Sequence, residues 1–136
     1  KDEMLVISQE VNELQKREAH KTFFQMDNET KGRVCSIFDR LGTDARNILD
    51  TPHPSPGELR KLLFSLGLIR SPKIIILDEP VNHMDVTAAE AFEKVLRRVD
   101  CAVILISHDT DILERCTDYR WNISRVDELT NRLDIV

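Results

Sequence analysis

The sequence predicts an α/β fold, in which a mostly parallel sheet is accompanied by a small helical subdomain. The first observation is the run Ile74–Leu77, three of whose four residues are β-branched, because such runs are typical of strands covered on both faces. The second is a similar buried-type run at Ala102–Ile106. A helix-patterned segment, 86–99, separates the two runs, and a strand, a helix and a strand at this spacing form a βαβ unit with parallel strands.

The composition fits one compact domain. The chain has 136 residues, 41% of them hydrophobic, which is enough for a sizeable core. A net charge of -5 and a pI near 5.4 give no general attraction to nucleic acid or anionic membranes. No apolar run approaches the roughly 20 residues of a membrane span, and no signal peptide is visible. The three cysteines show no CxxC spacing, so we expect no disulfide framework or zinc site and a cytoplasmic location.

The first half of the chain predicts one short strand followed by helices. Met4–Ser8 is strand-like, and Gln9 follows at its exit. The segment 10–54 is mostly polar and helix-patterned, with a further short helix indicated by Ala45, Ile48 and Leu49. Apolar residues keep the helical spacing closely at Val34, Ile37, Phe38 and Leu41, and loosely at Val11, Leu14, Phe23 and Phe24. Ordinary helix packing explains this segment.

A sharply defined helix start follows a proline-rich loop. Ser55 is placed as the N-cap, Pro56 occupies the first helical position, and Glu58 completes a capping box. The apolar stripe consists of Leu59, Leu62, Leu63 and Leu66, with Arg60 and Lys61 on the other side. Two interpretations stay open. The motif is either a good helix start alone or also an anion site, where Gly57 allows a phosphate to approach free backbone N–H groups.

Polar residues follow both buried strands at their carboxyl ends. Asp78 and Glu79 end the first strand, and His108, between Ser107 and Asp109, follows the second. Parallel strands bring these ends to one edge, where open α/β sheets bind ligands. Adjacent carboxylates are rarely placed at such an edge without a partner or metal, so the pair indicates metal and nucleotide chemistry. His108 beside such a pair is more typical of function than of packing.

The remaining segments have simpler predictions. Asp85 is placed to cap the helix at 86–99. Residues 110–116 are expected to form a short helix, 119–123 a half-exposed strand, and 133–136 a last short strand. Trp121 is interpreted as an ordinary packing residue.

Four motifs together resemble the ATP-binding cassette (ABC) ATPases, whose core is of the P-loop NTPase type. They are Ser55–Glu58, Ile74–Pro80, Asn82–Asp85 and Ser107–Asp109, and the resemblance runs from Gln9 to about Ile123. It implies ATP and Mg²⁺ as cofactors and ATP hydrolysis between two facing cassettes. It also implies three regions: 1–9 for the end of a core strand and the Q-loop, 10–54 for the helical subdomain, and 55–136 for the signature helix and the rest of the core.

The resemblance also implies residue roles. Glu79 resembles the catalytic glutamate and His108 the switch histidine. Asp78 resembles the Walker B aspartate that holds Mg²⁺, and Gln9 the Q-loop glutamine that senses metal and nucleotide. The nucleotide-binding residues implied are Gln9, Ser55, Gly57, Glu58 and Asp85. Three positions depart from the usual pattern: Pro54, Pro56 and Val81.

One family motif is absent from the sequence. No G-x-x-x-x-G-K followed by Ser or Thr occurs, although this loop is the main phosphate cradle. In the family it lies upstream of the Q-loop, so we interpret the chain as the latter part of one cassette and expect this fragment alone to be inactive. The strand that carries the loop normally lies beside the strand ending at the switch histidine, so 102–106 should have an unpaired side.

Several functional classes remain open at this stage. The motif around Asn82–Asp85 and the tail around Trp121 look most like the ABC-F proteins, which lack membrane domains and act on ribosomes. The expected partners are then a second cassette and the ribosome. An ATPase subunit of a transporter is the alternative, and a non-catalytic interaction module with the same fold is another. A chromosome-maintenance ATPase is disfavoured because no coiled-coil heptads occur.

Overall fold

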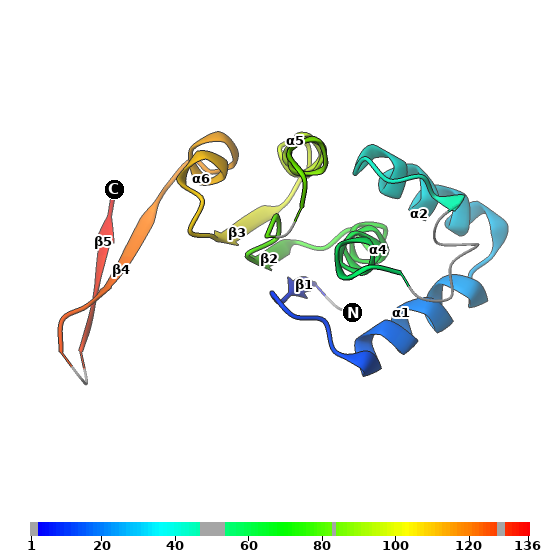
Figure 1. Ribbon diagram of the computed structural model, residues 1–136, viewed down its shortest axis with the longest axis horizontal. Coiled ribbons are helices and arrows are strands. Elements are labelled where there is room, and N and C mark those ends of the chain that lie inside the picture. The colour runs from blue at the N-terminus through cyan, green and yellow to red at the C-terminus, as the bar shows by residue number, and fades with distance from the viewer. Residues whose placement is uncertain (1–2, 47–53, 83, 128–129) are drawn as a thin grey trace.

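The computed structural model describes residues 3–46, 54–82, 84–127 and 130–136. Within these ranges helices lie beside a three-stranded sheet, and a two-stranded ribbon projects from one end (Figure 1). In chain order the elements are β1 (Met4–Ile7), α1 (Glu13–Gln25), α2 (Asn28–Arg40), α4 (Pro56–Leu68), β2 (Ile74–Asp78), α5 (Val86–Leu96), β3 (Ala102–Ile106), α6 (Thr110–Cys116), β4 (Trp121–Arg125) and β5 (Asn131–Ile135). The short helix predicted around Ile48 and Leu49 lies outside the described residues.

The three-stranded sheet is parallel and has the order β1-β2-β3. Ile7 pairs with Leu77, and Asp78 at the end of β2 pairs with Ile106 at the end of β3. The β2-α5-β3 segment is the predicted βαβ unit, so the α/β fold with a parallel sheet is confirmed. Within the described chain β3 is an edge strand, as the resemblance implies.

The described chain covers only one face of this sheet. On that face Ile75 and Leu77 are fully buried, in one cluster with Phe64 of α4 and Phe92 of α5, whose ring centroids lie 4.9 Å apart. The large apolar residues that remain exposed on the other face are Met4, Val6, Ile74, Ile104 and Ile106. The prediction that β2 is covered on both faces, and β3 buried, is therefore wrong for the described residues. The reason is that α4 and α5 lie on the same side of the sheet (Figure 1).

Helices α1, α2 and α4 enclose a second core. Phe23, Val34, Phe38 and Leu62 pack there and are at most 1% exposed. Capping fixes the helix starts, because Asn12 caps α1 and Asp27 caps α2 through its carboxylate and the Thr30 N–H. Leu14 and Phe24 remain exposed, so the loosely spaced apolar residues of α1 contribute less than the closely spaced ones of α2.

Helix α4 lies between the two cores. The Ser55 hydroxyl accepts a hydrogen bond from the Glu58 N–H, and the Glu58 carboxylate accepts one from the Ser55 N–H, which confirms the predicted capping box. The side opposite the leucine stripe is also buried, because Arg60 is 7% and Lys61 5% exposed. Lys61 Nζ donates to the Thr43 hydroxyl over 2.6 Å. Because α4 is packed on two sides, Arg60 and Lys61 are buried, although the amphipathic pattern assigns them to the solvent side.

Strands β4 and β5 form an antiparallel ribbon in which Trp121 pairs with Ile135. Trp121 is 61% exposed, so its interpretation as an ordinary packing residue is wrong within the described chain. The reason is that the ribbon projects from the other elements (Figure 1). Helix α6 occupies 110–116 as predicted, whereas α5 ends at Leu96 rather than Val99 because Arg97 caps it. No helix within the described ranges is long and apolar enough to cross a membrane.

Candidate functional site

The backbone turns sharply after β2, directly beyond Asp78. Glu79 has a φ of 47°, in the left-handed region that residues other than glycine rarely adopt. Its N–H donates to the Ile106 carbonyl over 2.9 Å, and its own carbonyl accepts from the Asn82 N–H over 3.2 Å. Such a conformation costs about 1–3 kcal/mol and persists where surrounding contacts hold it. The turn is therefore a strained, well-supported position at the carboxyl edge of the sheet.

The strained backbone directs the Glu79 side chain toward the end of β3. Oε1 accepts a hydrogen bond from the His108 N–H over 2.8 Å, and Oε2 accepts one from the Ser107 hydroxyl over 3.2 Å. His108 Nε2 lies 3.8 Å from Oε1, while the imidazole itself is fully exposed. Only 15% of the Glu79 side chain is exposed. The structure thus brings the predicted Glu79 and His108 together, and it adds Ser107.

Asp78 and Gln9 lie at the same edge. Asp78 is half-buried, and no described residue donates a hydrogen bond to its carboxylate. Ile7, the last residue of β1, pairs with Leu77, and Gln9 follows two residues later, so it leaves the sheet at the same edge as Asp78 and Glu79. The described residues include no group of three or more His, Cys, Asp or Glu that could enclose a metal. A site with one free carboxylate suits Mg²⁺, which takes one or two protein carboxylates and completes its shell with water and phosphate oxygens.

The start of α4 has one backbone donor left over. Pro56 has no N–H, and the N–H groups of Glu58 and Leu59 are bonded to Ser55. Gly57 follows Pro56, and its N–H has no partner within the described residues. An added Cβ at Gly57 would meet nothing within 4 Å, so there is room beside this residue. The position suits an incoming anion, although nothing in the described chain requires glycine there.

Asp85 has a structural contact of its own. Its carboxylate accepts a hydrogen bond from the Ala88 N–H over 2.9 Å, which makes it the predicted N-cap of α5. Asp85 also lies near Lys61, together with Glu58. Burial lowers the pKa of the Lys61 amine, and the two carboxylates partly oppose that shift. His83, in the same motif, lies outside the described residues.

Three curated relatives are similar to the chain in sequence. It is 30% identical to the ATP-binding protein Uup of Escherichia coli K12 over 76% of this chain, and 31% identical to the ribosome protection protein VmlR of Bacillus subtilis 168 over 87%. It is 35% identical to the zinc import ATP-binding protein ZnuC of Pseudomonas fluorescens Pf0-1 over 63%. No protein-family model matches the chain.

Solved structures of cassette proteins share the fold. A dimeric, post-hydrolysis state of the ATP-binding cassette MJ0796 with ADP and Pi matches with a TM-score of 0.66 over 85% of this chain and 56% of that chain, at 17% identity. A model of ribosome-bound archaeal Pelota and ABCE1 matches with a TM-score of 0.73 over 96% of this chain and 23% of that one, at 22% identity. By sequence and by fold, the chain belongs to the ABC ATPases.

This ABC chain is short beside its relatives. The matched region spans 15% of Uup, 22% of VmlR and 34% of ZnuC. The matched region therefore shows the family but not the activity or partners of the whole protein.

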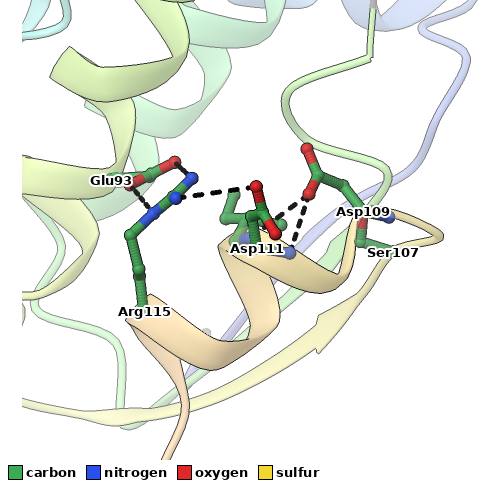
Figure 2. Close-up of polar contacts among 6 residues, drawn as sticks. Glu93, Ser107, Asp109, Asp111 and Arg115 are labelled. Atoms are coloured by element: carbon green, nitrogen blue, oxygen red, sulfur yellow. Dashed lines mark hydrogen bonds and ion pairs between the residues drawn. The ribbon is translucent and has the colours of Figure 1, made fainter.

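The segment that carries His108 in this ABC chain is anchored through α6 (Figure 2). Asp109 caps α6 by accepting from the Asp111 N–H over 2.9 Å, and the Ser107 hydroxyl accepts from the Asp109 N–H over 3.1 Å. One turn further on, Arg115 donates to both carboxylate oxygens of Glu93 on α5, over 2.9 and 2.8 Å. The Glu93 interaction raises the pKa of the Arg115 guanidinium. These contacts fix the direction in which the chain leaves β3.

The cysteines offer no competing chemistry. Burial raises the pKa of the thiols of Cys35, Cys101 and Cys116, which keeps them protonated at neutral pH. All three are free thiols.

The sequence did not indicate two contributors to the site. Ser107 was placed at the edge of the sheet, but its hydrogen bond to Glu79 depends on the left-handed backbone of Glu79. No residue pattern predicts that conformation. Arg60, whose Nη1 donates to the carbonyls of Glu79 and Asn82, was assigned to the outside of α4. The only indication in the sequence was the position of Arg60 in the turn after the capping box. This position is too common in helices to mark Arg60 as part of the site.

Proposed function

We propose that this chain is the latter part of one ABC cassette, and that the intact protein hydrolyses ATP between this cassette and a second one facing it. The observation that carries the proposal is the placement of the Glu79 carboxylate beside His108, with the neighbouring Asp78 carboxylate unbonded among the described residues. ABC membership supports it. A carboxylate held at the edge of a parallel sheet, with a second acid left open for a metal, suits phosphoryl transfer to water.

Glu79 is the proposed general base of this reaction. Bound Mg²⁺-ATP would supply the phosphoryl group and the metal charge that offsets its negative charge. The Glu79 carboxylate would orient the attacking water and accept its proton. His108 would extend its imidazole toward the terminal phosphate, because the ring is fully exposed, with Nε2 3.8 Å from Glu79 Oε1, while its backbone N–H is bound to Glu79. Both residues are proposed as catalytic.

Asp78 and Gln9 are the proposed metal contacts. The unbonded, half-buried carboxylate of Asp78 suits direct or water-mediated binding of Mg²⁺. Gln9 is exposed at the exit of β1, where its amide could reach the metal and the nucleotide.

The start of α4 is proposed to face the nucleotide of the second cassette. The Gly57 N–H, which has no partner among the described residues, and the positive end of the helix suit a phosphate. Ser55 and Glu58 hold that geometry through the capping box, and Asp85 fixes the neighbouring helix start. Ser55, Gly57, Glu58 and Asp85 are therefore proposed nucleotide-site residues, and Gly57 has the backbone donor that no described residue binds.

The proposal includes the division of the chain and the location of the missing phosphate loop. Residues 1–9, 10–54 and 55–136 would correspond to the end of a core strand with the Q-loop, the helical subdomain, and the signature helix with the rest of the core. The phosphate loop would be supplied by a part of the protein outside this chain. The exposed apolar face of the sheet and the unpaired edge of β3 support this, since both suit a further layer of chain.

The partner is proposed to be the ribosome. One relative is named as a ribosome protection protein, and one structural neighbour comes from a ribosome-bound assembly. The alternative is an ATPase subunit of a transporter, which the relative ZnuC favours by its name. Action in the cytoplasm fits either case.

The first experiment compares ATP turnover by this chain with turnover by a version extended upstream by about one hundred residues, roughly the rest of an average domain. We expect turnover from the extended version only. Glu79→Gln should lower its turnover at least about a hundredfold while ATP binding persists, and the exposed Glu90→Gln on α5 is the matched control. Undiminished turnover with Glu79→Gln would rule out the base assignment. Failure of the extended version to bind ATP would favour a non-catalytic interaction module.

A second experiment separates the partners. The Glu79→Gln variant of the extended version, with ATP bound, should sediment with purified ribosomes. It should dissociate from them when ATP is removed. Co-purification with a membrane protein instead would favour the transporter alternative.

A further inference from the structure

Arg60 is a buried cation with an unusual set of contacts. It lies on α4, is 7% exposed, and has no carboxylate partner in the described chain. Its Nη1 donates to the carbonyl of Asn82 over 3.1 Å and, more weakly, to the carbonyl of Glu79 over 3.4 Å. Its Nε is buried and has no hydrogen-bond partner among the described residues. Arg60 therefore binds the two ends of the turn that follows β2.

Stability alone does not explain this arrangement. A buried, unpaired N–H costs about 1–3 kcal/mol, and burying a charged guanidinium without a carboxylate partner adds a desolvation cost. A methionine would fill the same space between the cores without that cost. The contacts that Arg60 does make go to backbone carbonyls of the strained segment, where an apolar side chain can make none.

The turn that Arg60 binds is the one that positions the Glu79 carboxylate. Glu79 keeps its left-handed φ of 47°, and the Asn82 N–H returns to the Glu79 carbonyl, so this oxygen accepts from both the turn and Arg60. The carboxylate on that backbone accepts from the His108 N–H. If the turn relaxed toward an ordinary conformation, the side chain would be re-aimed and this hydrogen bond would be lost.

We propose that Arg60 is a positioning residue, which holds the Glu79 turn and couples it to α4. This inference rests on the proposed function of Glu79. Since α4 also begins at Ser55–Glu58, the same helix would contact the nucleotide of the facing cassette at its start and hold the general base of its own site one turn later. One side chain would thus link the two ATP sites through a single rigid helix.

The test uses the extended protein with Arg60→Met, Arg60→Lys and the control Arg98→Gln. Arg98 follows α5, is exposed, and bonds no described residue through its side chain. The first measurement is amide hydrogen exchange without nucleotide. We expect Arg60→Met to speed exchange at the Asn82 and His108 amides, both bonded to Glu79, by about tenfold relative to the remaining core amides. Arg60→Lys should restore part of the protection, because lysine keeps the positive charge but cannot reach both the Glu79 and the Asn82 carbonyl as arginine does.

The second measurement is ATP turnover by the same proteins. Arg60→Met should lower kcat about tenfold at nearly constant KM, because the base and not the nucleotide is displaced. If exchange at the two amides is unchanged, or rises only in step with all core amides as the melting temperature falls, Arg60 is merely structural and the inference is overturned. Because exchange needs no nucleotide, it decides about Arg60 even if the extended protein shows no turnover, which would contradict the proposed function separately.

Discussion

The two-point ion pair between Arg115 of α6 and Glu93 of α5 gives a quantitative stability prediction. The two N–H···O distances are 2.9 and 2.8 Å, and the Glu93 side chain is only 12% exposed against 51% for Arg115. Exposed ion pairs contribute about 0.2–1 kcal/mol, and two-point geometry on a mostly buried carboxylate places this one near the upper end. We expect a coupling free energy of about 1 kcal/mol between the two side chains.

A double-mutant cycle measures this coupling, with Arg115→Met, Glu93→Met and the double variant in the extended cassette, followed by urea unfolding. Arg115→Met should cost more than Glu93→Met, because it leaves a mostly buried carboxylate without its partner. Glu93→Met leaves a half-exposed guanidinium that keeps water and Asp111, whose carboxylate lies 3.9 Å away. A coupling below about 0.3 kcal/mol, or the reverse order of the single variants, would refute the assignment of this pair as the anchor of α6.

Two further predictions concern the cores and the pH dependence. Phe64→Ala should lower the free energy of unfolding by about 3–5 kcal/mol, because its fully buried ring packs against Phe92, whereas Phe24→Ala, at a half-exposed ring, should cost less than half as much in the same urea titration. Hydrogen bonds from the Thr30 N–H and hydroxyl hold the pKa of Asp27 below its usual 3.8, so its contribution to stability is present above that pH and is lost as pH falls through the lowered value. Asp27→Asn should flatten the stability profile below about pH 4, and an unchanged slope there would contradict this origin.

The parts of the fold that the sequence predicted are those with local signals. The capping box from Ser55 to Glu58 and the cap at Asp85 depend on contacts within one helical turn, and the structure contains both. The edge position of Asp78 and Glu79 follows from strand direction, which the βαβ spacing fixes. Local chemistry and connectivity were therefore sufficient to predict the elements and the edge where the candidate site lies.

The predictions that were wrong concern side-chain burial, which depends on what packs against each helix or strand. Ile74 and Ile104 have the composition of fully buried strands, yet their exposure depends on whether another layer packs on the sheet. Arg60 and Lys61 have the composition of a solvent face, yet α4 is packed on both sides. The residue types of a segment show which environments its side chains tolerate, whereas tertiary packing determines which environment they have. The residue pattern of one segment therefore does not predict the burial of these side chains.

Asp78 and Glu79 are adjacent in the sequence, but their carboxylates lie in different directions. Side chains alternate along β2, so Asp78 belongs to the face of Ile74 and Ile76, which the described chain leaves open. Regular strand geometry would send Glu79 to the covered face, among Ile75 and Leu77. Its left-handed backbone instead brings the carboxylate to His108 at the end of β3. A one-residue change of backbone conformation thus gives two adjacent acids two environments: the Asp78 carboxylate lies on the open side without a partner among the described residues, and the Glu79 carboxylate is held beside His108. Arg60, which binds the same turn from α4, is the described side chain best placed to preserve that difference.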